Sequence, residues 1–125
     1  MRSLMVIMWV LGALGSGAQG SNENELRKVR RLLDQGKVYP ALRRCDGLMT
    51  RDMAKAPVLL LRAEAHARVR SYPAALEDAR AAIAGGLDER GGQQAWFWTG
   101  MAWLGLQQGD SALHAFQRAT PAASP

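Results

Sequence analysis

Apolar residues recur at intervals of three and four in six stretches of this chain, a spacing that predicts amphipathic helices. Gly36 and the Gly85-Gly86 pair follow two of these stretches, and glycine readily adopts the left-handed conformation that ends a helix. No stretch alternates apolar and polar residues over more than a few positions, as a half-buried strand would. The predicted fold class is all-α, with helices over residues 22–35, 39–49, 56–69, 72–85, 93–107 and 111–119.

Three alanines mark an internal repeat of this pattern. Ala41 and Ala75 are 34 residues apart, and Ala112 follows Ala75 after 37. Each alanine lies early in the second helix of a predicted pair, which indicates three helical hairpins. The longer interval contains residues 85–92, including the Gly91-Gly92 pair, and we expect its extra residues to form a longer linker there.

The third hairpin carries the clearest motif. Trp96, Gly100 and Trp103 fall on one helical face, where a glycine lets the partner helix approach closely. Ala112 and Phe116 form the matching stripe on the second helix, and we expect Phe116 to insert against Gly100. This hairpin largely reproduces the W-x-x-L-G-x-x-Y and A-x-x-x-F spacing of the tetratricopeptide repeat family, which the chain resembles over residues 22–119 as about three degenerate repeats. The resemblance implies a TPR-like α-solenoid of stacked antiparallel hairpins with about six helices.

The same resemblance implies where a partner would bind. In this family the first helix of each hairpin faces a concave groove that holds a segment of a partner protein. Thr99 departs from the pattern, because a leucine is usual at its position. By register, the partner-binding residues include Leu26, Arg30, Leu60, Glu64, Phe97, Met101 and Leu104.

The end of the array suggests a second contact surface. The last predicted helix runs into Thr120-Pro121 and residues 120–125, which we expect to be a disordered tail without a polar cap for the third hairpin. Trp98 lies about 200° around the helix from Trp96 and would face the place of a next repeat. We expect Trp98 to anchor an interface with a partner protein or a second copy of the chain; the alternative is that it folds back onto the linker at residues 85–92.

The first twenty residues do not follow the repeat. Arg2 supplies a positive charge, residues 4–14 form an uncharged apolar run, and Ala18-Gln19-Gly20 offers small residues suited to cleavage. This pattern predicts a signal peptide over residues 1–20 and a repeat domain over residues 21–119. We therefore expect a protein that is secreted or located in the periplasm or cell envelope, with only transient membrane contact through the signal peptide.

Basic residues exceed acidic ones, with 16 Lys and Arg against 11 Asp and Glu and a formal net charge of +5. Several gather between Arg27 and Arg44, namely Arg27, Lys28, Arg30, Arg31, Arg43 and Arg44. A solvated helix face explains such a cluster in the simplest way. The alternative function is a small basic protein that binds an anionic polymer or a membrane surface. No nucleic-acid partner is expected.

Residues suited to catalysis are sparse. His66 and His114 lie in different repeats without a metal-binding spacing, and no nucleophile elbow, phosphate-binding loop or paired C-x-x-C motif occurs. The sequence therefore predicts a protein that is not an enzyme and needs no cofactor or metal. Cys45 is the only cysteine and cannot form an intramolecular disulfide. Its position on an apolar stripe predicts a buried thiol; a redox or intermolecular role is the alternative.

Overall fold

The computed structural model describes residues 20–121, which contain six helices and no strand, as the sequence predicted. Within this range the first helix covers residues 20–34. It is followed by α2 (Val38–Leu48), α3 (Ala56–Arg68), α4 (Tyr72–Gly85), α5 (Glu89–Gly105) and α6 (Gly109–Ala119). The expectations of a signal peptide and of a disordered tail concern residues that lie almost wholly outside this range.

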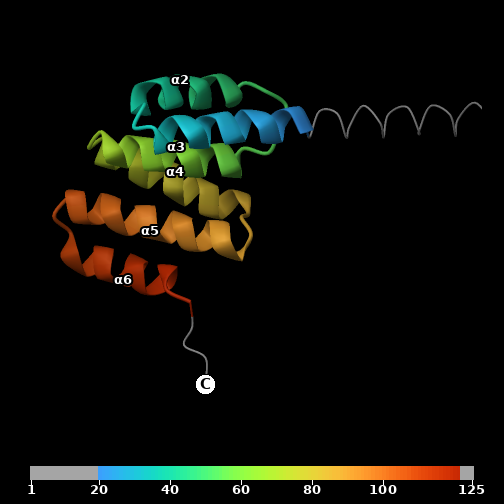
Figure 1. Ribbon diagram of the computed structural model, residues 1–125. Helices are drawn as coiled ribbons and strands as arrows, with labels where there is room; N and C mark the ends of the chain where they lie inside the picture. Colours follow the sequence, from blue (N-terminus) through green and yellow to red (C-terminus); the bar gives the residue numbers. More distant parts are fainter. Residues whose placement is uncertain (1–19, 122–125) are drawn as a thin grey trace, which may run out of the picture.

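The three hairpins stack in chain order, and each consists of two antiparallel helices (Figure 1). Helix 20–34 packs with α2, α3 packs with α4, and α5 packs with α6. The second helix of one hairpin also packs on the first helix of the next, α2 against α3 and α4 against α5. In addition α3 contacts α5 directly, so the first helices of successive hairpins are neighbours and present a common face.

The turn inside each hairpin has the same backbone conformation. Gly36, Arg70 and Gln107 have positive φ angles of 75°, 64° and 62°, and they are separated by the repeat spacing of 34 and 37 residues. The residue after each of them donates its backbone N–H five residues back: Lys37 to Leu32 at 2.8 Å, Ser71 to His66 at 2.8 Å, and Gln108 to Trp103 at 2.9 Å. This is the Schellman arrangement that ends a helix. The backbone turns therefore recur with the same spacing as Ala41, Ala75 and Ala112.

The extra residues of the third repeat lengthen a helix instead of a linker. Helix α5 begins at Glu89, so Gly91 and Gly92 lie in its first turn, where the sequence had predicted a linker and a start at residue 93. Asp88 is the reason: its side chain accepts a hydrogen bond from the Gly91 N–H at 2.7 Å and caps the helix. A cap of this kind offsets the low helix propensity of two glycines.

Small side chains dominate the core. Around the first hairpin the buried cluster consists of Val29, Leu33, Ala41, Cys45, Leu48, Val58 and Ala65. Cys45 is fully buried, as expected. Burial raises the pKa of its thiol to about 12, so the thiol stays protonated and unreactive near neutral pH.

Two glycines let aromatic rings touch the backbone of α5. A Cβ atom placed on Gly100 would lie 2.6 Å from Cε1 of Phe116, which confirms the expected insertion of Phe116 from α6. The ring of Tyr72, at the start of α4, lies in the same way over Gly105. These contacts hold α5 between its two neighbours. Within residues 20–121, no helix has the length and apolar character needed to cross a membrane.

Candidate functional site

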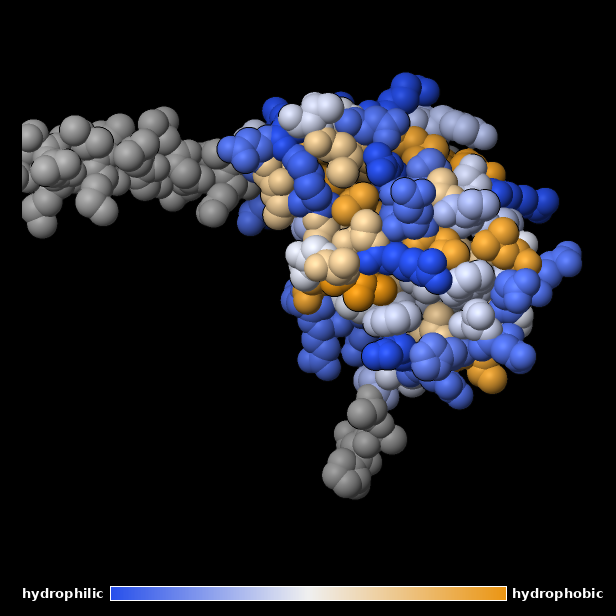
Figure 2. All heavy atoms as spheres, turned by 180° about the vertical axis from the view of Figure 1, so that it is seen from behind, coloured by the Kyte–Doolittle hydropathy of each residue, from blue (hydrophilic) through white to orange (hydrophobic). Residues whose placement is uncertain are grey.

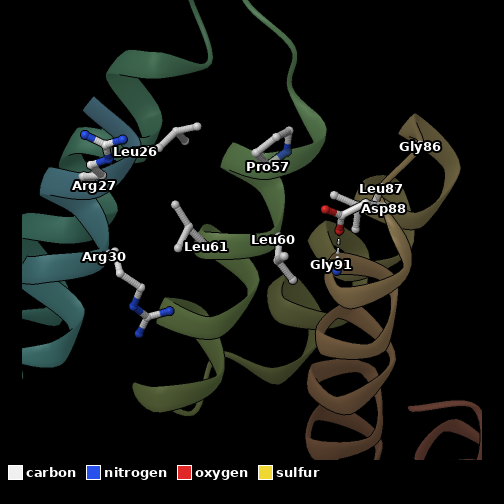
Figure 3. Close-up of a pocket in the computed structure, with 10 residues that line it drawn as sticks. All are labelled: Leu26, Arg27, Arg30, Pro57, Leu60, Leu61, Gly86, Leu87, Asp88 and Gly91. Atoms are coloured by element: carbon white, nitrogen blue, oxygen red, sulfur yellow. Dashed lines mark hydrogen bonds between the residues drawn. The ribbon is translucent and has the colours of Figure 1, made fainter. Parts of the chain in front are cut away.

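A groove runs across the first helices of the hairpins (Figure 3). Helix 20–34 contributes Leu26, Arg27 and Arg30, α3 contributes Pro57, Leu60 and Leu61, and the start of α5 with the preceding loop contributes Gly86, Leu87, Asp88 and Gly91. The groove has a volume of about 450 Å³, within the range of protein binding pockets. Three successive hairpins therefore build one concave site.

The groove combines an apolar floor with charges on opposite walls. Leu26, Leu60 and Leu61 supply apolar side chains, and Arg27 stands on the wall formed by helix 20–34 (Figure 3). Within the described residues, no carboxylate lies within ion-pair distance of Arg27. Across the groove, the Asp88 carboxylate accepts a hydrogen bond from the Gly91 N–H in the first turn of α5. The groove therefore offers apolar contacts and one available cation.

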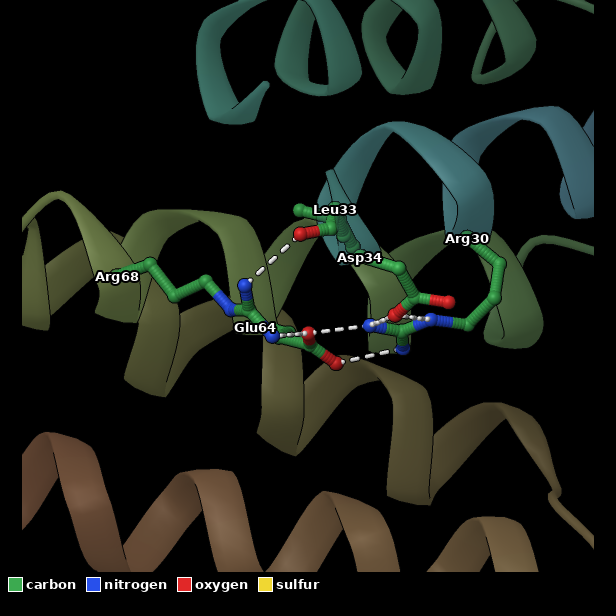
Figure 4. Close-up of polar contacts among 5 residues, drawn as sticks. All are labelled: Arg30, Leu33, Asp34, Glu64 and Arg68. Carbon is green, nitrogen blue, oxygen red and sulfur yellow. Dashed lines mark hydrogen bonds and ion pairs between the residues drawn. The ribbon is translucent and has the colours of Figure 1, made fainter. Parts of the chain in front are cut away.

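Arg30 lines the groove but points its guanidinium at Glu64 (Figure 4). The two Arg30 amino groups donate to the two Glu64 oxygens at 2.8 and 2.7 Å, and Arg68 pairs with the same carboxylate at 2.7 Å. Arg68 also donates to the backbone carbonyl of Leu33 at 2.9 Å, and Arg30 reaches Asp34 at 3.0 Å. The cluster thus joins the first hairpin to the second.

This cluster corrects the expected role of Glu64. Its side chain is only 7% exposed, and both carboxylate oxygens are engaged by arginines. A buried carboxylate needs such cations because burial without them is costly. Glu64 therefore holds two hairpins together and does not present its carboxylate to a partner.

The predicted site residues on α5 do not join the groove. Phe97 and Leu104 are exposed, at 42% and 53%, and Met101 is half-buried, but none of them lines the groove. Phe97 lines a separate hollow at the end of the stack, together with Phe116 and Pro121. Of the eight predicted partner-binding residues, Leu26, Arg30 and Leu60 are brought together in the groove.

Trp98 lies in a different environment from the one expected. It is half-buried and packs against a cluster that includes Ala67 on α3, Leu76 on α4 and Ala102. This placement is possible because α5 contacts both α3 and α4 of the second hairpin. Trp98 therefore packs on the second hairpin and does not project toward the place of a fourth hairpin. The cluster that it packs against contains no residue of the linker at residues 85–92.

The sequence pattern did not predict several of the residues that line the groove. Leu61 and Pro57 belong to α3 but fall outside the family register, and Leu87 and Asp88 precede the residue at which α5 was expected to begin. Asp88 followed by Glu89 is a readable start of a helix. The two glycines that follow were instead interpreted as a linker, which hid this wall of the groove.

The basic cluster is partly neutralised. Lys28 and Arg44 both pair with Glu25, at 3.0 and 3.1 Å, and the hydrogen bond from Lys28 is the main cause that lowers the pKa of Glu25. Arg30 is held by Glu64. On the face shown in Figure 2, hydrophilic side chains are interspersed with hydrophobic ones. This arrangement gives little support to an extended anion-binding surface.

Comparison with protein-family models, curated proteins and solved structures finds no match. Among the described residues, no group of three or more His, Cys, Asp or Glu side chains is placed to hold a metal ion. His66 is half-buried between α3 and α4, with Nε2 3.6 Å from a carboxylate oxygen of Asp78, whereas His114 is exposed.

Proposed function

We propose that this protein is an exported interaction module of TPR-like architecture that binds a segment of a partner protein in the groove. The single observation that carries the proposal is the composition of the groove, to which three successive hairpins contribute an apolar floor and an available cation. Stacked helical hairpins commonly use their concave surface in this way. The N-terminal pattern of Arg2, the apolar run and the small residues at 18–20 supports export.

The groove also indicates the chemistry of the partner segment. Leu26, Leu60 and Leu61 favour an apolar side chain as the anchor, because its burial supplies most of the binding energy. Arg27 favours an acidic residue beside that anchor, since a charge at the rim of a site selects the partner's charge more than it adds affinity. The expected ligand is therefore a short segment with an apolar anchor and a neighbouring carboxylate.

A selection from a random peptide library tests the proposal. Peptides that bind the full chain should lose affinity by about tenfold or more in Leu60→Glu, because a carboxylate would replace an apolar contact on the groove floor. Leu113→Glu is the matched control, since Leu113 is 58% exposed on α6 and does not line the groove. Circular dichroism of both variants checks that they fold.

A second pair of variants tests the charge. Arg27→Glu should weaken binding of the acidic peptides, whereas Arg43→Glu makes the same charge change on an exposed arginine of α2 and should leave binding unchanged. Selected peptides that bind Leu60→Glu and Arg27→Glu as well as the parent would contradict the proposal. Binding to polyanions that Arg43→Glu and Arg27→Glu weaken equally would favour the basic-cluster alternative.

A further inference from the structure

A second pocket lies between α4, α5 and α6 and shares no lining residue with the groove. It has a volume of about 470 Å³. Its walls are formed by Arg80 of α4, by Trp96, Thr99 and Trp103 of α5, and by Asp110, Ser111, His114 and Ala115 of α6. We call it the lateral pocket.

The equivalent place one repeat earlier is filled by an ion cluster. There Arg62 of α3 donates to both oxygens of Asp78 at 2.8 and 2.9 Å and to Asp46 at 3.1 Å. By the repeat spacing, Asp46 corresponds to Arg80, 34 residues later. Arg62 and Asp78 correspond to Thr99 and Ala115, 37 residues later. Arg80, Thr99 and Ala115 all line the lateral pocket. The step between the second and third hairpins therefore lacks the central cation and both of its carboxylates.

Short side chains leave this space open. The hydroxyl of Thr99 donates to the Ala95 carbonyl of its own helix at 2.8 Å, so it does not bridge α4 and α6. Ala115 is too short to reach across. Because threonine replaces the usual leucine of the family pattern, neither an ion cluster nor an apolar side chain fills the pocket.

One charge at this step is reversed relative to the preceding one, and Asp110 of α6 contributes a carboxylate to the pocket wall. Arg80 takes the position of an aspartate, and its guanidinium carbon lies 5.2 Å from the centre of the Trp103 ring. In the described part of the chain no carboxylate is within ion-pair distance of Arg80. The second indole of the pocket, Trp96, is covered by Arg118 at 4.7 Å. An arginine held over an indole keeps its donors in a fixed plane, which suits a carboxylate.

We propose that the lateral pocket binds a small organic carboxylate with a flat apolar body. The carboxylate would pair with Arg80, and the flat body would contact the indoles of Trp96 and Trp103. Ser111 and His114 add hydrogen-bonding groups on the α6 wall. The site is separate from the groove, and its occupation does not depend on the proposed peptide binding.

Binding of benzoate to the full chain, followed by the NMR signals of the indole N–H groups, tests this proposal. Benzoate should shift the signals of Trp96 and Trp103 saturably, with a Kd of about 1 mM, as is reasonable for a ligand of this size. The Trp98 signal is the internal reference, since Trp98 does not line the pocket. Benzamide, which has the same ring without the charge, should bind about tenfold more weakly.

Variants separate charge from shape. Arg80→Gln should weaken benzoate binding by about tenfold while leaving benzamide binding unchanged. Arg43→Gln is the matched control, because Arg43 is an exposed arginine outside the pocket. Thr99→Arg places an arginine at the position that corresponds to Arg62, where it would fill the pocket, and should abolish binding of both compounds. The proposal is wrong if the Trp96 and Trp103 signals do not move, if benzamide binds as well as benzoate, or if Arg80→Gln retains full benzoate affinity.

Discussion

At the scale of single residues, Glu64 shows how one charge can belong to the core of a helical stack. Arg30 lies 34 residues before Glu64, at the same position of the preceding repeat, so stacking of the hairpins brings the two side chains together. Arg68, one turn later on α3, completes the pairing. The three charge-assisted bonds satisfy a carboxylate that is otherwise shielded from water.

Replacing Glu64 should therefore reduce stability. Glu64→Gln keeps the shape of the side chain but removes the negative charge from between two arginines, and we expect a loss of about 2 kcal/mol in the free energy of unfolding. Asp34→Asn is the control, because the Asp34 side chain is 64% exposed and should change stability by less than about 0.5 kcal/mol. Urea unfolding measures both. Equal stability of the two variants would show that the Glu64 cluster contributes nothing beyond an exposed ion pair.

At the scale of the elements, α5 is the helix on which the third hairpin depends. It contacts α3, α4 and α6, and its small residues allow close approach on two sides. Gly100 receives the Phe116 ring from α6, and Gly105 receives the Tyr72 ring from α4. The glycines lower the helix propensity of α5, but they permit packing that a larger side chain would block.

This packing can be tested with a double-mutant cycle on Gly100 and Phe116. Alanine has a helix propensity about 1 kcal/mol better than glycine, yet Gly100→Ala should destabilise the parent by about 1 to 2 kcal/mol because the new methyl group would collide with the Phe116 ring.

In the Phe116→Ala background the collision is absent, so Gly100→Ala should become neutral or stabilising by up to about 1 kcal/mol. The free energies of unfolding of the parent, the two single variants and the double variant provide the measurement. Additive effects in the cycle would rule out the direct contact.

At the scale of the whole molecule, the stack separates two candidate binding surfaces. The groove is built by the first helices of three hairpins, whereas the lateral pocket lies between the second and third hairpins and uses α4 and α6. A chain of this size can therefore offer a peptide site and a small-ligand site without a shared residue. Contact of the third hairpin with a partner protein or a second copy of the chain stays a prediction, and Phe97 and Leu104 are exposed on this hairpin.

Export is a prediction that concerns the whole chain. Arg2, the apolar residues 4–14 and Ala18-Gln19-Gly20 predict cleavage that leaves a mature protein beginning near Gln19 or Ser21. Mass spectrometry of the protein purified from its native source measures the N-terminus directly. Recovery of a chain that starts at Met1 in a soluble cytosolic fraction would contradict export.

The sequence by itself determined the helices and their repeat. The three- and four-residue spacing of apolar positions reports which face of a helix is buried, and this is a local property. Ala41, Ala75 and Ala112 gave the register that the turns at Gly36, Arg70 and Gln107 then followed. The burial of Cys45 and the contact between Phe116 and Gly100 were predictable for the same reason.

Only the tertiary structure decided which neighbours each helix face meets. Trp98 turned toward the second hairpin because α5 packs on both α3 and α4, and Glu64 became a core ion because stacking brought Arg30 beside it. The lateral pocket is open because Thr99 does not bridge α4 and α6, whereas Arg62, at the equivalent position one repeat earlier, forms an ion cluster. This difference is seen only when the two steps of the stack are compared. Such outcomes depend on side chains 34 or more residues apart, whose mutual placement a local pattern does not contain.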